Sequence, residues 1–443
     1  MSNRRDRRSV LRAGLACCSL GLAGCLDLVG EGGEDGNEAG GGSSDGTEPP
    51  NGTAPDPNGT DGNGTDTDGN STDPDDDEPP EPDPEPVTSW PMQQYDAQNT
   101  GAVPAPSPAE VELDWQFDAD HDIRSSPVVD DGTVYLGDRR GTIYAIENGS
   151  ATWKTTVPDD RVDSTPAMYD DLLIVPLETT LQAFDRSSGE HQWTYPSEYG
   201  VGKITVADDA VFFGDTTSQV HAVEARSGIL RWKMSSDVYQ SSYDEPPAIH
   251  DGEVFIPRTG GAGSESWELS AIDIDNGMRR PLLRTSEYGL LTGVSIADET
   301  LFIGASDGVH AYDTAGSEVW HAPTERRVES GLAVTNELVV GMTTDGSDGT
   351  VLGLDRESGE IRWEITTRSS DNTGPVVCGN YTVWGVHGPD IESTVIAVDV
   401  TTGEIEWERT VEEFSGYHHW AVANGFLYAA GTAGFVSAYR IIG

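Results

Sequence analysis

AVDVTTGEIEW, residues 397–407, is the clearest copy of a pattern that recurs along most of the chain. A strand is expected to end at Ala397-Val398-Asp399, and a return strand is expected to begin just before Trp407. Between them, Gly403 suits a tight turn, because glycine adopts positive φ without a steric penalty. The pattern therefore predicts a β-hairpin.

The same combination of a small residue, an acidic residue, a turn glycine and a tryptophan occurs in seven units. Tryptophan stands four residues after the turn glycine in every unit except the fourth, where Pro281 replaces it. From Trp115, which precedes the first unit, to Trp407, neighbouring tryptophan positions are 38 to 49 residues apart when Pro281 is counted as the position of the fourth unit. Counting one tryptophan that precedes the first unit, the set is Trp115, Trp153, Trp193, Trp232, Trp320, Trp363 and Trp407.

A period near 40 residues, with several short strands in each unit, is typical of a β-propeller. Eight innermost strands can be counted, which predicts an all-β, eight-bladed β-propeller of four-stranded blades. The last unit ends one strand short, and an open ring would leave unpaired strand edges. We therefore predict that the N-terminal strand closes the ring, with residues 113–117 pairing with residues 435–439. The tryptophans are interpreted as structural contacts that dock neighbouring blades.

The charge of the chain is strongly negative. It has 26 basic and 77 acidic residues, a net charge of −51, and its lysines are Lys154, Lys203 and Lys233 alone. Such a protein is repelled by nucleic acid and by bare anionic membrane surfaces. Few lysines and many carboxylates favour adaptation to high salt, where self-repulsion is screened. The alternative is an acidic protein from an ordinary source.

Residues 1–25 have the layout of an export signal, with a basic region followed by an apolar run. Arg7-Arg8 resembles the twin-arginine export motif. The apolar run is too short for a permanent transmembrane helix, which needs about 20 residues. Leu22-Ala23-Gly24-Cys25 resembles a lipobox, which would make Cys25 a lipid-anchored first residue at the outer face of the cell membrane. A cleaved soluble signal with an incidental cysteine is the alternative.

Residues 26–87 are expected to be a disordered acidic linker. They contain 19 Asp or Glu and no Lys or Arg, so they cannot bury enough apolar surface to become ordered, and charge repulsion extends them into a stalk. Candidate glycosylation sequons begin at Asn51, Asn58, Asn63 and Asn70, although such sequons also arise by chance in this composition. Residues 88–443 are then the propeller, expected to be monomeric.

The units resemble the pyrroloquinoline-quinone (PQQ) repeat family. The resemblance rests on SSPVV at residues 125–129, VYLG at residues 134–137, and the opening Trp90-Pro91 and Asn99-Thr100-Gly101. The resemblance covers about residues 90–443. The chain as a whole looks like a haloarchaeal-type secreted lipoprotein with PQQ-like repeats. The resemblance implies eight blades docked by tryptophans. It also implies either a quinoprotein dehydrogenase, with quinone and Ca²⁺ on the axis, or a non-catalytic protein-binding relative like the lipoprotein of the bacterial barrel-assembly machine.

The chain departs from the dehydrogenases of that family in several ways. Those that oxidise alcohols carry adjacent cysteines over the cofactor and long insertions around it, whereas residues 88–443 hold only Cys378. There is no C-x-x-C-H haem motif, and no sequence motif that supplies a nucleophile or an acid/base pair. We therefore expect a non-enzymatic scaffold for a protein or glycan partner, without a cofactor or metal. A PQQ- and Ca²⁺-dependent dehydrogenase of sugars or alcohols is the alternative.

Loops that lead into the innermost strands of a propeller converge at one mouth of the central channel. Six polar residues stand at or just before those strand starts, and the adjacent histidines among them could meet a metal or a quinone carboxylate. Polar lining of a water-filled channel is the alternative, and consecutive residues of a strand point to opposite faces. The six candidates are Arg124, Lys203, Glu245, Glu329, His418 and His419.

Overall fold

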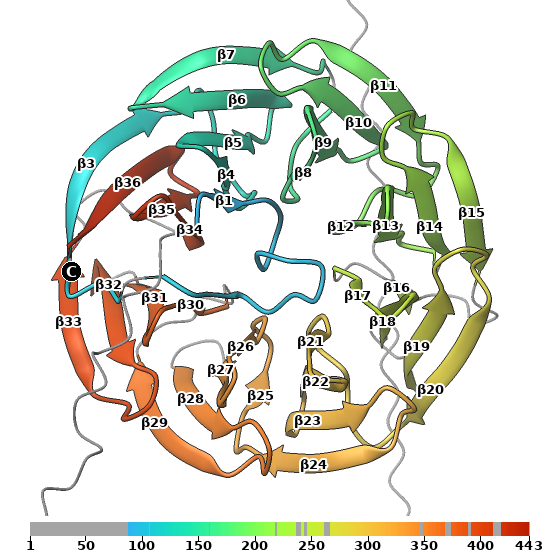
Figure 1. Ribbon diagram of the computed structural model, residues 1–443, viewed down its shortest axis with the longest axis vertical. Helices are drawn as coiled ribbons and strands as arrows, with labels where there is room; N and C mark the ends of the chain where they lie inside the picture. Colours follow the sequence, from blue (N-terminus) through green and yellow to red (C-terminus); the bar gives the residue numbers. More distant parts are fainter. Residues whose placement is uncertain are drawn as a thin grey trace, which may run out of the picture. The chain divides into compact units, whose positions relative to one another are not determined.

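A computed structural model describes residues 87–105, 107–158, 160–217, 219–235, 241–242, 246–260, 266–344, 349–367, 374–388, 391–410 and 418–442. The twin-arginine pair, Cys25, residues 26–86 of the predicted acidic linker and its sequons lie outside these residues. The described chain forms eight β-sheets arranged as the blades of a closed ring around a central axis (Figure 1). The predicted all-β, eight-bladed propeller is confirmed.

The blades follow one another around the ring in chain order. Blade 1 contains β4 (Val128–Asp130), β5 (Thr133–Gly137), β6 (Thr142–Glu147) and β7 (Ser150–Thr156). Blade 2 contains β8 (Ala167–Tyr169), β9 (Leu172–Pro176), β10 (Thr180–Asp185) and β11 (His191–Pro196). Blade 3 contains β12 (Ile204–Ala207), β13 (Ala210–Gly214), β14 (Gln219–Glu224) and β15 (Leu230–Ser235). Blade 4 contains β16 (Ser241–Ser242), β17 (Ala248–His250), β18 (Glu253–Gly260), β19 (Trp267–Asp273) and β20 (Arg279–Thr285).

The second half of the ring is built in the same way. Blade 5 contains β21 (Ser295–Ala297), β22 (Thr300–Ala305), β23 (Gly308–Asp313) and β24 (Glu318–Pro323). Blade 6 contains β25 (Arg327–Val328), β26 (Ala333–Val334), β27 (Leu338–Thr344), β28 (Gly349–Asp355) and β29 (Ile361–Thr367). Blade 7 contains β30 (Val376–Cys378), β31 (Tyr381–Gly388), β32 (Ile391–Asp399) and β33 (Ile405–Thr410). Blade 8 contains β34 (His418–Ala423), β35 (Phe426–Gly431), β36 (Phe435–Ile442) and β3 (Glu110–Asp118).

The N-terminal strand closes the ring as predicted. β3 pairs antiparallel with β36, and Leu113 lies opposite Tyr439 while Phe117 lies opposite Val436. The outer strand of blade 7, β33, also contributes, because the Trp407 indole N–H donates a hydrogen bond to the Pro108 carbonyl just before β3. The strand that precedes blade 1 and the last strand of the chain are therefore paired in one sheet, and the ring has no open edge at its seam.

Burial explains why the strands of one blade differ in sequence. A middle strand such as β9 (LLIVP) is buried at every position, because neighbouring blades cover both of its faces. An outer strand such as β11 alternates between exposed and more buried positions, which is typical of a half-buried strand. The apolar core is accordingly divided into layers between blades rather than gathered at one centre.

The hairpin at residues 397–407 has the predicted geometry. Ala397 lies opposite Trp407 across a bulge, and Gly403 has φ of 74°. The acidic residue of the pattern supports the turn, because the Asp399 carboxylate accepts hydrogen bonds from the backbone N–H groups of Thr401 (2.9 Å) and Thr402 (2.8 Å). Asp355 holds its turn in the same way, and hydrogen bonds, first from the Ser358 hydroxyl, lower its pKa to about 2.

The tryptophans dock each blade onto the next. The Trp193 indole N–H donates to the Ala225 carbonyl (3.1 Å), and the ring lies against Gly228 of the following blade. The indole N–H groups of Trp153, Trp232, Trp320 and Trp363 make the corresponding bond to the next blade, over 2.6 to 2.9 Å. In blade 4, which lacks the tryptophan, Leu282 lies under Gly316 instead.

Gly353 gives a first testable prediction, because it replaces the alanine of the repeat pattern. It lies opposite Trp363, and a Cβ at Gly353 would overlap the Trp363 indole. Glycine-to-alanine changes at unstrained sites usually stabilise a protein. Here we expect Gly353→Ala to lower the free energy of unfolding by about 1–3 kcal/mol through overpacking. Denaturant unfolding measures the loss, and a Trp363→Phe background should reduce it; an unchanged loss would contradict the proposed overlap.

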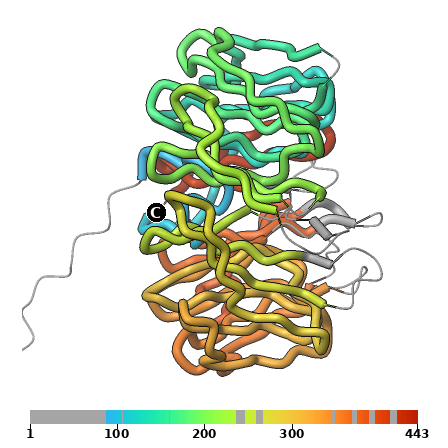
Figure 2. Tube along the Cα trace, turned by 90° about the vertical axis from the view of Figure 1, so that its right-hand side faces the viewer, coloured from blue at the N-terminus to red at the C-terminus, as the bar shows by residue number. Residues whose placement is uncertain are grey.

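A segment that precedes the ring occupies its centre. Residues 87–105, here called the hub segment, include β1 (Ser89–Trp90) and β2 (Ala102–Val103), drawn in blue inside the ring (Figure 1) and toward one face of it (Figure 2). β1 adds a strand to blade 1, and β2 adds a parallel strand to blade 7, so these sheets have five strands rather than the predicted four. In blades 4 and 6 the fifth strand arises because two short strands share one partner.

Backbone hydrogen bonds fasten the hub segment to most of the ring. Its carbonyl groups accept bonds from the inner strands of successive blades, at N···O distances of 2.7 to 2.9 Å, through the N–H groups of Met168, Ile249, Ile296, Val334 and Val377. Without the segment, those N–H groups would be unpaired on inner strand edges. The hub segment therefore completes the inner edges of these five blades, and it lies at the centre of the ring (Figure 1). No helix within the described ranges is long and apolar enough to cross a membrane.

Candidate binding site

A polar pocket of about 160 Å³ lies on the axis, where the inner strands begin. The hub segment supplies part of its wall through Trp90, Gln93, Gln94 and Asn99. The remainder comes from residues at or beside the starts of the inner strands, contributed by all eight blades. Because the hub segment occupies the channel, this site is a pocket built against the chain's own N-terminal region.

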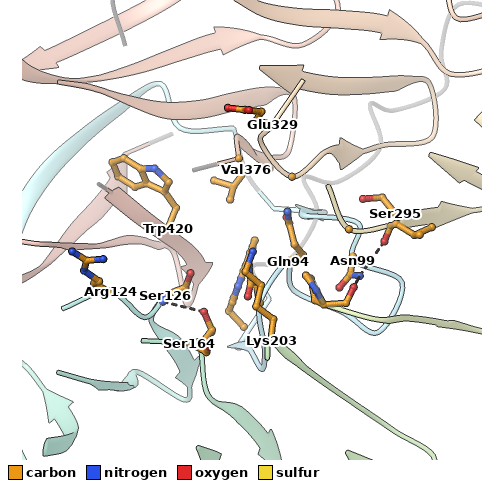
Figure 3. A pocket seen from close by; sticks show the side chains of 18 of the residues that line it. Gln94, Asn99, Arg124, Ser126, Ser164, Lys203, Ser295, Glu329, Val376 and Trp420 are labelled. Atoms are coloured by element: carbon orange, nitrogen blue, oxygen red, sulfur yellow. Dashed lines mark hydrogen bonds between the residues drawn. The ribbon is translucent and has the colours of Figure 1, made fainter. Parts of the chain in front are cut away.

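Three of the six predicted residues line this pocket. Arg124, Lys203 and Glu329 come from blades 1, 3 and 6, and Figure 3 shows them around it. Glu245 lies outside the described residues. His418 and His419 belong to β34, so they are in a strand rather than a loop, and nothing is described of their side chains. Trp420, the next residue of β34, lines the pocket.

Charges of both signs surround the pocket. Arg124 is exposed, and Lys203 and Glu329 are half-buried. Glu329 accepts a hydrogen bond from the Arg327 guanidinium over 2.9 Å. Asp163, which also lines the pocket, forms ion pairs with two arginines, at 3.2 Å from Arg139 and 2.8 Å from Arg161. The rim thus offers cations and carboxylates together.

The wall of the pocket contains buried polar atoms that lack a partner. The Asn99 side-chain amide donates to three backbone carbonyls, including that of Val294 at 3.0 Å, and it ties the hub segment to blades 4 and 5. Its carbonyl oxygen has no hydrogen-bond partner, and neither has the indole N–H of Trp90, although these residues are 2% and 1% exposed. A buried acceptor and a buried donor are therefore available to a polar group or to water.

Sequence reasoning missed Asn99 and Asp163 as pocket residues. Asp163 stands just before the inner strand of blade 2, at a position like that of Arg124 in blade 1, so the register of the repeats was a usable signal. Asn99 had only the weaker signal of the Asn-Thr-Gly tripeptide. Nothing local in the sequence shows that this tripeptide lies on the axis.

The described residues of the pocket do not fit a quinone held by Ca²⁺. Calcium takes 6–8 oxygen ligands, usually with several carboxylates. The described lining holds two carboxylates, Asp163 and Glu329, and both are paired with arginines. Within the described ranges, the one cluster of His, Cys, Asp and Glu with metal-ligand spacing lies elsewhere, in blade 5. These lining residues also provide no nucleophile activated by a base.

These features define the class of protein. Eight blades, tryptophan docking between them and a polar axial pocket describe a PQQ-like repeat propeller. The chain belongs to the family whose model is described as outer membrane protein assembly factor BamB, which matches residues 100–315 and 305–441.

Relatives of this chain include enzymes and an assembly factor. It is 24% identical over 249 residues to polyvinylalcohol dehydrogenase of a Pseudomonas species, covering 50% of this chain and 36% of that protein. It is 24% identical over 198 residues to BamB of Salmonella typhimurium, covering 42% of this chain and 48% of that protein. The chain thus spans less than half the length of either relative.

Among solved structures, the crystal structure of BamB from Moraxella catarrhalis resembles this propeller with a TM-score of 0.62 and 17% identity. The alignment covers 75% of this chain and 100% of that one. At this identity the likeness concerns the fold alone.

Proposed function

We propose that this protein is a non-enzymatic, extracytoplasmic scaffold whose axial pocket and its rim bind a protein partner. The observation that carries the proposal is the pocket itself: it is small, it has charges of both signs, and the chain's own hub segment forms part of its wall. Mixed charges suit the charged side chains of a protein surface. The family supports the proposal, since it is described by the name of an assembly factor.

A protein fits this pocket better than a glycan. Sugar rings are commonly bound by aromatic side chains with one face exposed. The two tryptophans that line the pocket, Trp90 and Trp420, are only 1% and 4% exposed, so they offer no such stacking face. The crosslinking experiment described below would also detect a glycan ligand, as a crosslink to polysaccharide.

The location remains part of the proposal. The protein is exported in a folded state through Arg7 and Arg8, anchored by a lipid on Cys25, and held away from the outer face of the cell membrane by the acidic linker. High external salt screens its negative charge. Labelling cells with a lipid precursor tests the anchor: the wild type should be labelled, and Cys25→Ser should not.

Site-specific photo-crosslinking in the producing cells tests the binding face. A photoreactive residue in place of Arg124 should crosslink to one defined protein. The same residue in place of Val319, which is 53% exposed on the outer strand β24, should not. Lys203→Glu should lower the yield at position 124 by about tenfold or more, because reversing a charge at an interface places like charges opposite each other. Equal yields at both positions, or a crosslink to polysaccharide, would contradict the protein-scaffold proposal.

The dehydrogenase alternative is tested separately on the purified chain at high salt. PQQ, Ca²⁺ and an artificial electron acceptor are added, and both cofactor binding and dye reduction are measured. We expect neither at micromolar PQQ. Stoichiometric PQQ binding with dye reduction would establish the enzyme instead of the scaffold.

A further inference from the structure

Blade 5 holds two histidines and an aspartate within metal-ligand spacing of one another, away from the axial pocket. Their ligand atoms all lie within 4.8 Å. Asp307 stands in the turn between β22 and β23, His310 lies on β23, and His321 lies directly opposite His310 on β24. The Nε2 atoms of His310 and His321 are 3.1 Å and 3.7 Å from the two carboxylate oxygens of Asp307.

The surroundings of His310 orient its ring. His310 is 1% exposed and stacks between Tyr288, at 4.2 Å, and His321, at 4.0 Å between centroids. Its Nδ1 atom faces the Tyr312 hydroxyl (3.2 Å) and the Glu318 carboxylate (3.4 Å). A proton on Nδ1 directed at a carboxylate leaves the Nε2 lone pair free toward Asp307 and His321. This carboxylate–histidine arrangement is the one that commonly supports a metal-bound histidine.

Comparison with blade 3 separates what the repeat requires from what blade 5 adds. Blade 3 has the same aspartate–histidine pair, with Asp215 Oδ2 3.2 Å from His221 Nε2, and the Tyr195 hydroxyl lies 2.9 Å from Nδ1. The residue opposite His221, however, is Lys233. The aspartate–histidine contact alone is therefore a structural element of the repeat. Blade 5 differs in having His321 at the position of this lysine. His321 offers a further metal ligand, whereas a lysine there would repel a cation.

We propose that Asp307, His310 and His321 bind a divalent transition-metal ion, for which Zn²⁺ is the probe. Zn²⁺ accepts imidazole nitrogen and carboxylate oxygen, and many of its sites use three protein ligands and a water. The outer ligands can adjust, because the side chains of His321 and Asp307 are 29% and 40% exposed. The rings of His310 and His321 are stacked in the structure, so we expect His321 to rotate on metal binding until both Nε2 atoms lie about 2.0–2.1 Å from the ion.

Equilibrium dialysis of the full chain, without a histidine tag and after removal of metal by a chelator, tests this site. Excess Mg²⁺ occupies the acidic surface, and Zn²⁺ is added at micromolar concentrations. We expect one Zn²⁺ per chain. His321→Lys, which reproduces the blade 3 arrangement at a surface position, should abolish stoichiometric binding. His191→Asn, a change at an exposed histidine of β11, is the matched control and should bind as the wild type does.

Melting temperatures with and without Zn²⁺ show whether a variant that fails to bind Zn²⁺ is still folded. Zn²⁺ should raise the melting temperature of the wild type and of His191→Asn, and should leave that of His321→Lys unchanged. Glu318→Gln should weaken Zn²⁺ binding by about tenfold, as expected for a residue that orients a ligand. If the wild type binds no Zn²⁺ at these concentrations, or if His321→Lys binds it equally, the site does not exist.

Discussion

Trp90→Ala is expected to lower the free energy of unfolding by about 3–5 kcal/mol, the usual cost of removing a buried large aromatic side chain. Trp90 is 1% exposed and belongs to the largest core cluster of the propeller, together with residues of blades 1, 7 and 8. It also packs against Tyr95 of the hub segment, with 5.3 Å between the ring centroids and 52° between the ring planes. Its loss therefore opens a cavity where the hub segment meets the seam of the ring. Denaturant unfolding with a tryptophan-independent probe, such as far-ultraviolet circular dichroism, measures the effect.

Trp90→Phe serves as the control for this prediction. Since the Trp90 indole N–H has no hydrogen-bond partner in the structure, phenylalanine removes no bond and only part of the packing. We expect a smaller loss, of about 1–2 kcal/mol. Hydrogen exchange should also show faster exchange at Val129, which lies opposite Trp90, in the alanine variant. If the alanine and phenylalanine variants are equally stable, the hub segment contributes little to closing the ring.

Glu268→Ala is expected to destabilise the protein by about 3–5 kcal/mol, the typical cost of removing one partner of a buried ion pair. Glu268 is fully buried in blade 4, the blade that lacks the docking tryptophan. Its carboxylate accepts hydrogen bonds from Ser270 (2.7 Å) and Arg284 (2.6 Å), and it also pairs with Arg279, whose side chain is 14% exposed. The alanine variant leaves Arg279 without this partner. Chemical denaturation at constant salt measures the loss.

An exposed ion pair of the same blade provides the matched control. Arg280 pairs with Glu253 over 2.8 Å, and its side chain is 48% exposed. Arg280→Ala should cost less than about 1 kcal/mol, because exposed pairs are weak and screened by salt. If both substitutions cost the same, burial does not govern the contribution of Glu268.

The contribution of Glu268 should also depend on pH. Burial by itself raises the pKa of this carboxyl, but the Ser270 hydrogen bond and the charges of Arg279 and Arg284 together hold the pKa below its ordinary value of 4.5. A depressed pKa means that the stabilisation is fully present above the unfolded value and is lost as pH falls through the folded one. The stability difference between the wild type and Glu268→Gln should therefore be constant near neutral pH and should shrink below about pH 4.5.

The candidate site could be predicted only in part. Arg124, Lys203 and Glu329 were identified because the repeat register shows where each innermost strand begins. Asn99 was not, because its place beside the pocket depends on a segment that precedes the repeats and hydrogen-bonds to blades far apart in sequence. The blade 5 histidines had a signal that was available but unused: aligned units place His310 and His321 opposite each other, where blade 3 has His221 and Lys233.

The sequence by itself determined the hairpin, the blade and the number of blades. Those features rest on local chemistry repeated many times: a turn glycine at positive φ, an aspartate that binds its own turn, and a tryptophan at a constant spacing. The pairing of β3 with β36 could also be inferred, because a ring with one missing strand has a single way to close.

Only the tertiary structure decided what lies on the axis. The hub segment carries no repeat pattern, and its hydrogen-bond partners are the inner edges of blades that meet only when the ring has closed. The buried network around Glu268, by contrast, lies within one hairpin, because its partners come from β19 itself and from the adjacent strand β20. Local preference specifies hairpins, whereas long-range contacts of the closed ring place the hub segment and shape the pocket beside it.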